Sequence, residues 1–412
     1  MTGAAQVGVQ ALGFLSGIVI LRSLSPHEYA YYTILNTVLG AMTVLTDSGA
    51  TSAVLTHGGR AWNSRAALGR VLSTGLYLRR RFAALAMGAG LPALLMLLHH
   101  QGATWLKATL IALSALPSFY LSVSGQMLEV VPRLHQKLAP LQRNQLLTNG
   151  ARAALLAASI RSFPYAAAAS LIAAIPQAWS NWQLRRLAAE HSDWQVPEDP
   201  VIRQRLLSQI GLAMPGAIYY AISGQITVWL IATFGGADKV ATVGALGRIA
   251  VAFGVLSTVF SIVAVPRFAR IPMADNARAL RRYWQMQALM ALVCAVPLAV
   301  LWLAGGRVLG ILGPHYSEFT ADALVMAGVG AVAVMNAAAL GLAAARGVVT
   351  PPLLSIPLSI VVQIVLIALF PISSVSGVLW LGLLSGASQW LLTVAYFAWK
   401  LEQVPGKGAE AA

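Results

Sequence analysis

Long apolar runs alternate with short polar stretches along the whole chain. A helix needs about 20 mostly apolar residues to cross a bilayer, whereas the strands of an outer-membrane barrel show about ten residues of alternating polarity. The pattern therefore predicts an all-α polytopic membrane protein with about twelve transmembrane helices. The expected spans are residues 6–24, 30–55, 82–99, 104–128, 144–160, 163–184, 207–234, 240–266, 284–304, 320–345, 350–370 and 374–399.

The most polar stretch, RRLAAEHSDWQVPEDPVIRQR, lies near the middle of the chain and leaves six spans on each side. We expect an N-terminal lobe at 1–184, a cytoplasmic linker at 185–206, a C-terminal lobe at 207–400 and a cytoplasmic tail at 401–412. The two halves align weakly at a shift of 210 residues, with Arg60 over Arg270. An even number of spans between repeats makes them parallel, and two such lobes around a central cavity are a transporter architecture. Coincidence between two apolar halves is the alternative.

The composition supports a membrane protein. Of 412 residues, 58% are hydrophobic and 10% are charged, against about 25% charged in an ordinary soluble domain. Too few charges are present to cover a soluble enzyme, and the hydrophobicity excludes a disordered chain. The single cysteine, Cys294, cannot form an intrachain disulfide, and we find no sequence motif for a metal or cofactor.

The net charge is +15, and the basic residues are distributed unevenly over the expected loops. Of the 28 Lys and Arg residues, 21 fall on one side, five on the other and two inside spans. The positive-inside rule then places both termini in the cytoplasm, and it explains the charge without nucleic acid. The basic segments 61–81 and 275–287 are expected to be amphipathic elbows lying on the cytoplasmic surface.

The two arginines inside spans are the main candidates for function. Arg152 is nine residues from both Arg143 and Arg161, and a charge at the centre of a span costs at least about 2.5–3.5 kcal/mol. We expect Arg152, with Asn149 beside it, to face a cavity and bind substrate; a structural ion pair with Asp47 is the alternative. Arg248 lies nine residues inside Lys239, where it can face a cavity or extend outward to the interface.

Other polar residues of the spans extend this candidate site. Arg22 ends the first span, where contact with lipid headgroups is the favoured interpretation and contact with substrate the alternative. Asp47 has three interpretations: a pair with Arg152, a proton-coupling carboxylate, or a cap at a helix break at Ser48–Gly49. Asn36, Tyr220 and Gln225 complete the set of candidate substrate contacts, with interhelical hydrogen bonds and interface aromatics as the alternatives.

Two segments resemble a known family. The segment LRSLSPHEYAYYTILNTVLGAMTVLTDSGATSAVL resembles the first two helices of the polysaccharide-type (Wzx) flippases of the MOP exporter superfamily, although Ser25 replaces the usual glycine. Residues 233–271 resemble the region of the seventh and eighth helices, including the closing Pro266–Arg267. The residues that fill the pattern of the first segment are Arg22, Leu24, Pro26, Glu28, Tyr29, Asp47 and Gly49.

The resemblance implies a MOP-like, MATE-like fold and a transport function. Such a protein flips polyprenyl-pyrophosphate-linked oligosaccharide across a bacterial inner membrane by alternating access, for O-antigen of lipopolysaccharide, capsule or exopolysaccharide. Its partners would be this lipid-linked substrate, membrane lipids, and the polysaccharide polymerase and glycosyltransferases of the same pathway. The alternatives are a MATE-like cation-coupled drug exporter and, less favoured, a membrane glycosyl polymerase or ligase. We expect no enzyme activity because the predicted outer loops are short and contain no catalytic motif.

Overall fold

The computed structural model describes residues 2–193, 196–272, 275–313 and 316–403, and its regular elements in these ranges are helices. The helices are α1 (Thr2–Ser23), α2 (Pro26–Asp47), α3 (Ala50–Ala61), α4 (Arg65–His100), α5 (Trp105–Leu128), α6 (Val130–Leu134), α7 (Leu138–Ser159), α8 (Ala166–Ala189), α9 (Pro200–Ser223), α10 (Ile226–Phe234), α11 (Ala237–Ala269), α12 (Asn276–Gly310), α13 (Thr320–Ala345), α14 (Pro352–Leu369) and α15 (Val375–Gln403).

Each of the twelve expected spans overlaps one helix or one broken pair of helices. The broken pairs are α2–α3 and α9–α10. Within the described residues, nine helices are long and apolar enough to cross a membrane, or ten when the bent α9 is included. The two halves of α9 differ in direction by 54° next to Pro215, a residue that breaks the helical hydrogen-bond ladder. The expectation of an all-helical, multi-pass membrane protein is confirmed.

The two expected elbows are not separate elements. Residues 65–81 are the first half of α4, which continues without a break to His100. Residues 276–287 likewise begin α12. These basic stretches carry buried side chains as well as charges, since Leu68, Leu72 and Tyr283 are all fully buried. Because their apolar faces are buried, these segments form part of the long helices, although their charges suggested separate elements.

The chain forms two compact units, Met1–Ala241 and Thr242–Ala412. In the first unit, α9 packs against α2, α3 and α4. Leu206 and Ile210 of α9 are almost fully buried in one core cluster with Leu72 and Val131. This burial explains why α9 belongs to the first unit. The lobe and linker boundaries expected around residues 185–206 stay a prediction.

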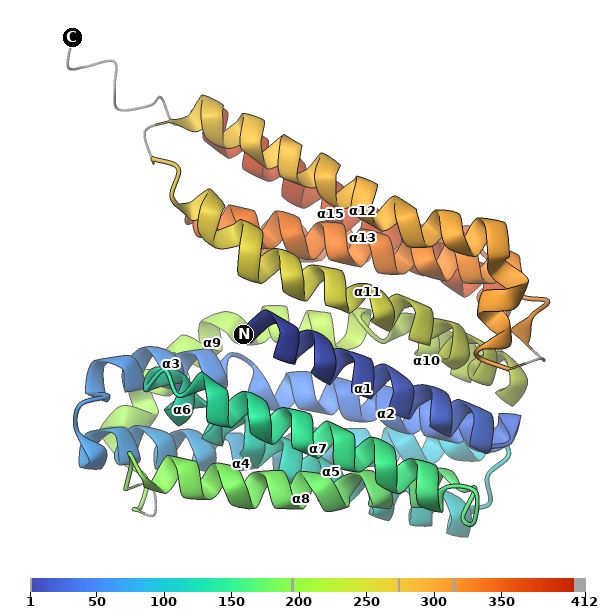
Figure 1. Cartoon of the computed structure of the whole chain (residues 1–412), viewed down its shortest axis with the longest axis horizontal. Helices are drawn as coiled ribbons and strands as arrows, with labels where there is room; N and C mark the ends of the chain where they lie inside the picture. The colour runs from blue at the N-terminus through green and yellow to red at the C-terminus, as the bar shows by residue number, and fades with distance from the viewer. Residues whose placement is uncertain (1, 194–195, 273–274, 314–315, 404–412) are drawn as a thin grey trace. The chain divides into compact units, whose positions relative to one another are not determined.

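The first unit is a bundle in which α1 packs on α7, α2 on α4, and α5 on α8 (Figure 1). Polar side chains bridge these helices. The Asn181 amide donates to the carbonyl of Leu121 over 2.8 Å and to Ser124 Oγ over 2.7 Å. Lipid offers no hydrophobic force between helices, so small residues and hydrogen bonds of this kind hold them together.

In the second unit, α12, α13 and α15 pack side by side, and α14 packs on α15 (Figure 1). An aromatic cluster fixes one region of its core. The rings of Tyr283 and Phe397 stack with centroids 4.3 Å apart, and Phe268 lies 6.4 Å from Phe397. Aromatic pairs at these separations contribute about 0.5–1.5 kcal/mol beyond their buried area.

The second span is broken at Ser48–Gly49, where both residues have positive φ angles of 35° and 85°. Glycine tolerates this left-handed conformation because it has no Cβ. The carboxylate of Asp47 accepts hydrogen bonds from the backbone N–H and the hydroxyl of Thr51 in the first turn of α3. Asp47 thus caps the restarted helix, which confirms one of its three interpretations.

Asp47 also has an ion-pair partner, and it is Arg79 rather than the expected Arg152. The Arg79 side chain is fully buried, and its Nη2 lies 3.5 Å from Asp47 Oδ1. Arg79 also donates to Gln126 Oε1 and, over 3.3 Å, to Thr51 Oγ1. We refer to Asp47, Thr51, Arg79 and Gln126 as the Arg79 cluster. It ties α2, α3, α4 and α5 together at the helix break.

A second polar cluster lies where α2, α5 and α8 begin. Glu28 is buried, with one carboxylate oxygen 2.6 Å from the ammonium of Lys107 at the start of α5. Its other oxygen accepts a 2.8 Å hydrogen bond from the backbone N–H of Ala166 at the start of α8. A carboxylate is stabilised at a helix N-terminus because unpaired N–H groups concentrate there. Glu28 therefore joins the ends of three helices.

We predict that Arg79→Leu destabilises the protein by about 3 kcal/mol, since it leaves Asp47 and Gln126 without their buried partner. Melting in detergent measures the effect, and Arg80→Leu, an exposed neighbour on the same helix, serves as the matched control. The double variant Asp47→Asn/Arg79→Leu should recover part of the loss because it removes the uncompensated charge. Equal melting of the Arg79 and Arg80 variants would contradict the cluster's structural role.

We predict a graded loss of stability at Glu28. Glu28→Gln keeps an acceptor for the Ala166 N–H but loses the ion pair, whereas Glu28→Ala loses both. Melting temperature should fall in the order wild type, Gln, Ala, with the Ala variant about 2–3 kcal/mol less stable because a buried N–H and an ammonium lose their acceptor. The exposed neighbour His27, changed to Ala, should have no comparable effect. An Ala variant as stable as wild type would contradict this role.

Candidate functional site

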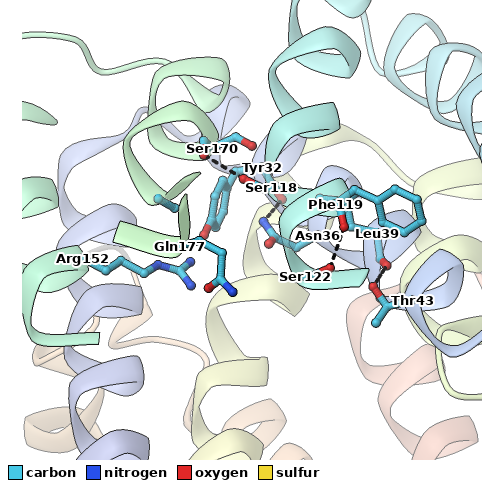
Figure 2. A pocket seen from close by; sticks show the side chains of 12 residues that line it. Tyr32, Asn36, Leu39, Thr43, Ser118, Phe119, Ser122, Arg152, Ser170 and Gln177 are labelled. Atoms are coloured by element: carbon cyan, nitrogen blue, oxygen red, sulfur yellow. Dashed lines mark hydrogen bonds between the residues drawn. The ribbon is translucent and has the colours of Figure 1, made fainter. Parts of the chain in front are cut away.

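A cavity of about 300 Å³ lies inside the first unit, between α2, α5, α7 and α8 (Figure 2). We call it the Arg152 pocket. Its volume is at the lower end of the range for ligand sites in proteins. The lining residues are Tyr32, Asn36, Leu39, Gly40, Thr43, Ser118, Phe119, Ser122, Arg152, Ser170, Ala173 and Gln177.

The spacing of these residues follows from helix geometry. Positions three or four apart lie on one face of a helix. Asn36, Gly40 and Thr43 satisfy this rule on α2, and Ser170, Ala173 and Gln177 satisfy it on α8. Each helix thus contributes one small or polar stripe. On α2 the stripe lines the pocket as far as Thr43, and the helix break at Ser48–Gly49 lies beyond it.

Arg152 provides the positive charge of the pocket. Figure 2 shows its side chain extending from α7 toward Gln177. Its Nε is buried without a hydrogen-bond partner, and within the described residues no acidic group lies in ion-pair range of its guanidinium. A guanidinium within a transmembrane helix bundle costs free energy unless a counter-charge reaches it. Arg152 is therefore poised to bind an anion.

The remaining polar lining is neutral, and most of its donors are already used. Asn36 Nδ2 donates to the Tyr32 carbonyl over 2.7 Å, and the Thr43 hydroxyl donates to the Leu39 carbonyl over 2.7 Å. The Ser118 hydroxyl donates to the Ser170 carbonyl over 3.2 Å, and the Ser122 hydroxyl donates to the Phe119 carbonyl over 2.9 Å (Figure 2). Their oxygen lone pairs stay available as acceptors. The pocket thus combines one cation with acceptors for ligand hydroxyl groups.

No carboxylate lines the Arg152 pocket. The two acidic residues of α2 do not line it, since Glu28 pairs with Lys107 and Asp47 pairs with Arg79. A cationic ligand would therefore meet Arg152 without an opposite charge to bind it. Like charges in a low-dielectric site repel strongly, so the electrostatics of this pocket favour an anion.

The structure brings some predicted residues to the pocket and not others. Arg152 and Asn36 line it, and the Gln225 amide lies 3.3 Å from the place that a Cβ on Gly40 would occupy. Asn149 instead donates to the carbonyl of Gln145 on its own helix over 2.9 Å. Gln225 precedes α10 at the break in the seventh span, so it lies beside the pocket without lining it.

The remaining predicted residues are Arg22, Arg248 and Tyr220. Arg22 is exposed in the last turn of α1. Arg248 is half-buried on α11 in the second unit, and its role stays a prediction. The side chain of Tyr220 lies outside the described residues.

The sequence analysis did not identify several residues that line the pocket, although the spacing of polar residues on α5 indicates some of them. Ser118, Ser122 and Gln126 are spaced four apart on α5, which is a polar stripe in an apolar span. The structure divides this stripe, because Ser118 and Ser122 line the pocket whereas Gln126 accepts from Arg79. Spacing alone identifies such a stripe but not the cavity or cluster that each member joins.

No protein-family model matches the sequence. No curated protein matches it either.

Solved structures, in contrast, match over almost the whole chain. An inward-facing multidrug resistance MATE family transporter of the MOP superfamily aligns with a TM-score of 0.71 at 13% identity, covering 97% of this chain and 96% of that chain. The lipid II flippase MurJ in an inward closed conformation aligns with a TM-score of 0.72 at 10% identity, covering 98% and 87%. An outward-facing MATE transporter gives 0.65 at 12% identity, covering 97% and 94%. The chain therefore has the fold of these MOP-superfamily transporters and flippases.

Proposed function

We propose that this protein translocates a polyprenyl-pyrophosphate-linked oligosaccharide from the cytoplasmic to the outer leaflet of a bacterial inner membrane. The observation that carries the proposal is the Arg152 guanidinium, which has no partner among the described residues and lies in a pocket of neutral hydrogen-bond acceptors. The fold is shared with both a lipid II flippase and multidrug transporters, so the choice between these functions rests on the pocket.

The chemistry of the substrate matches that of the pocket. A diphosphate and its sugars cannot cross about 30 Å of hydrocarbon without a polar path. The planar guanidinium of Arg152 binds phosphate oxygens bidentately. Sugar hydroxyl groups would donate to the free lone pairs of Asn36, Ser118 and Ser122. The size of the pocket suits the diphosphate and the adjoining sugar, which would be the part of the head recognised in every transport cycle.

The sequence supports the proposed membrane, pathway partners and energy source. The basic bias of the loops supports cytoplasmic termini in an inner membrane, and the pathway's glycosyltransferases and polymerase would make and consume the substrate for O-antigen, capsule or exopolysaccharide. The sequence contains no phosphate-binding nucleotide motif, so we propose alternating access driven by an ion gradient or by substrate supply rather than by ATP. Catalysis forms no part of the proposal.

A cation-coupled drug exporter is the second candidate, because the MATE transporters have the same fold as this chain. The lining of the Arg152 pocket argues against it, because a bound cation would face Arg152 and no carboxylate. Purified protein in liposomes separates the two functions. A flippase should move a fluorescent polyprenyl-diphosphate sugar between leaflets and leave cationic dyes in place, whereas dye transport without lipid flipping would overturn the proposal.

We predict that Arg152→Gln lowers the rate of lipid-linked sugar flipping in these liposomes by roughly 10–100-fold, since a charged hydrogen bond is worth about 1.5–3 kcal/mol. Arg152→Lys should keep part of the rate because it retains the charge. Arg161→Gln, which removes an exposed charge just after the same helix, should transport normally.

Stability provides an independent control on the same variants. A charge among membrane-spanning helices costs free energy when no counter-charge pairs with it, so Arg152→Gln should melt at the same temperature as wild type or higher. Full transport by a stable Arg152→Gln variant would refute the role of this residue. A large drop in its melting temperature would show that Arg152 is structural instead.

A further inference from the structure

A second and larger cavity lies outside the Arg152 pocket, between α7 and α8 near the start of α7. We call it the α7–α8 groove. Its volume is about 580 Å³, and none of its lining residues lines the Arg152 pocket. Arg143 and Arg152 are nine residues apart on α7, which at 100° per residue places them on opposite faces of the helix. The lining residues are Ala139, Pro140, Arg143, Asn144, Leu147, Trp179, Gln183 and Leu187.

The floor of the groove contains a polar side chain with an unused acceptor. Asn144 is 97% buried, as its exposed fraction is 3%. Its amide nitrogen donates to Ser180 Oγ over 2.8 Å, and this bond fixes the orientation of the amide. Its Oδ1 is buried and has no hydrogen-bond partner in the described part of the chain. A buried acceptor left unpaired costs about 1–3 kcal/mol, so a ligand donor at this position would be stabilising.

The rim of the groove is cationic. Arg143, which lines the groove, is exposed. Nearby acids are already engaged, because Glu129 pairs with Arg133 and Glu190 pairs with Lys137 at 3.1 Å. The charge that remains for a ligand at this end of α7 and α8 is positive.

The walls of the groove are apolar. Leu147 and Trp179 remain 47% and 38% exposed, and Leu187 lies eight residues after Trp179 on the same face of α8. Tryptophan is enriched at the level of lipid headgroups, where its ring contacts acyl chains and its N–H contacts water. A free phosphate ion would use the cationic rim but not these walls, whereas a phospholipid would use both.

We propose that the α7–α8 groove binds an anionic phospholipid with a glycerol headgroup. Arg143 contacts the phosphate, Asn144 Oδ1 accepts a hydrogen bond from a glycerol hydroxyl, and Leu147, Trp179 and Leu187 contact the upper part of an acyl chain. Basic pockets between transmembrane helices on the positively charged side are a general form of lipid recognition. This site is separate from the transport pocket and does not depend on the proposed transport function.

Native mass spectrometry of the full-length protein in detergent tests the proposal, with phosphatidylglycerol and phosphatidylethanolamine as probes. Wild-type protein should retain phosphatidylglycerol in preference to phosphatidylethanolamine, which has no net charge. Arg143→Gln should weaken phosphatidylglycerol binding roughly fivefold, as expected for the loss of one basic contact near the membrane surface. Leu147→Trp, which fills the groove from an exposed position, should weaken binding without removing a charge.

Arg185→Gln is the matched control because it removes an exposed charge at the same end of the bundle but does not line the groove. It should bind phosphatidylglycerol like wild type. Equal loss in the Arg143 and Arg185 variants, unchanged binding in both groove variants, or no preference for phosphatidylglycerol would overturn the proposal. Displacement of phosphatidylglycerol by polyprenyl diphosphate at equal concentration, abolished by Arg143→Gln, would instead assign the groove to the transported lipid.

Discussion

The high free-energy cost of a charge inside a bilayer organises much of the first unit of this protein. Two arginines within its helices, Arg79 and Arg152, differ in whether a counter-charge lies beside them. Arg79 has Asp47 beside it as a counter-charge, and both of its Nη atoms donate hydrogen bonds, to Thr51 and to Gln126. Arg152 lies in a cavity where such a partner is absent from the described residues. The paired arrangement of Arg79 is typical of a structural residue. The unpaired arrangement of Arg152 is typical of a residue that binds a ligand.

The paired charges give the pocket its rigid frame. The Arg79 cluster fixes the break between α2 and α3, and Glu28 fixes the far end of α2 against α5 and α8. These are the helices that, with α7, line the Arg152 pocket. Because both ends of α2 are held by charged contacts, its pocket residues Asn36 and Thr43 have defined positions. A preorganised site of this kind loses less entropy when it binds.

Helix α7 lines a different cavity on each of two faces. It is long enough for a span but too polar to be among the nine apolar helices. Its inner face presents Arg152 to the pocket, and the face nine residues earlier presents Arg143 and Asn144 to the α7–α8 groove. Both arginines of α7 thus lie at the two places where we propose ligands.

The sequence by itself determined that the chain is an all-helical, multi-pass membrane protein, because apolar runs of this length have no other stable form in a membrane. It also identified Arg152 and Asn36, since a charge or amide at the centre of a span is conspicuous. It misplaced Arg79, because a run of three arginines has the pattern of a membrane surface, and only packing shows that one of them turns inward to Asp47. The serines of α5 and α8 were equally ambiguous, because a serine hydroxyl can donate within its own helix, as Ser122 does, or to a neighbouring helix, as Ser118 does. Which polar stripe faces a cavity and which faces a partner helix depends on how helices far apart in sequence pack, and that was decided by the tertiary structure alone.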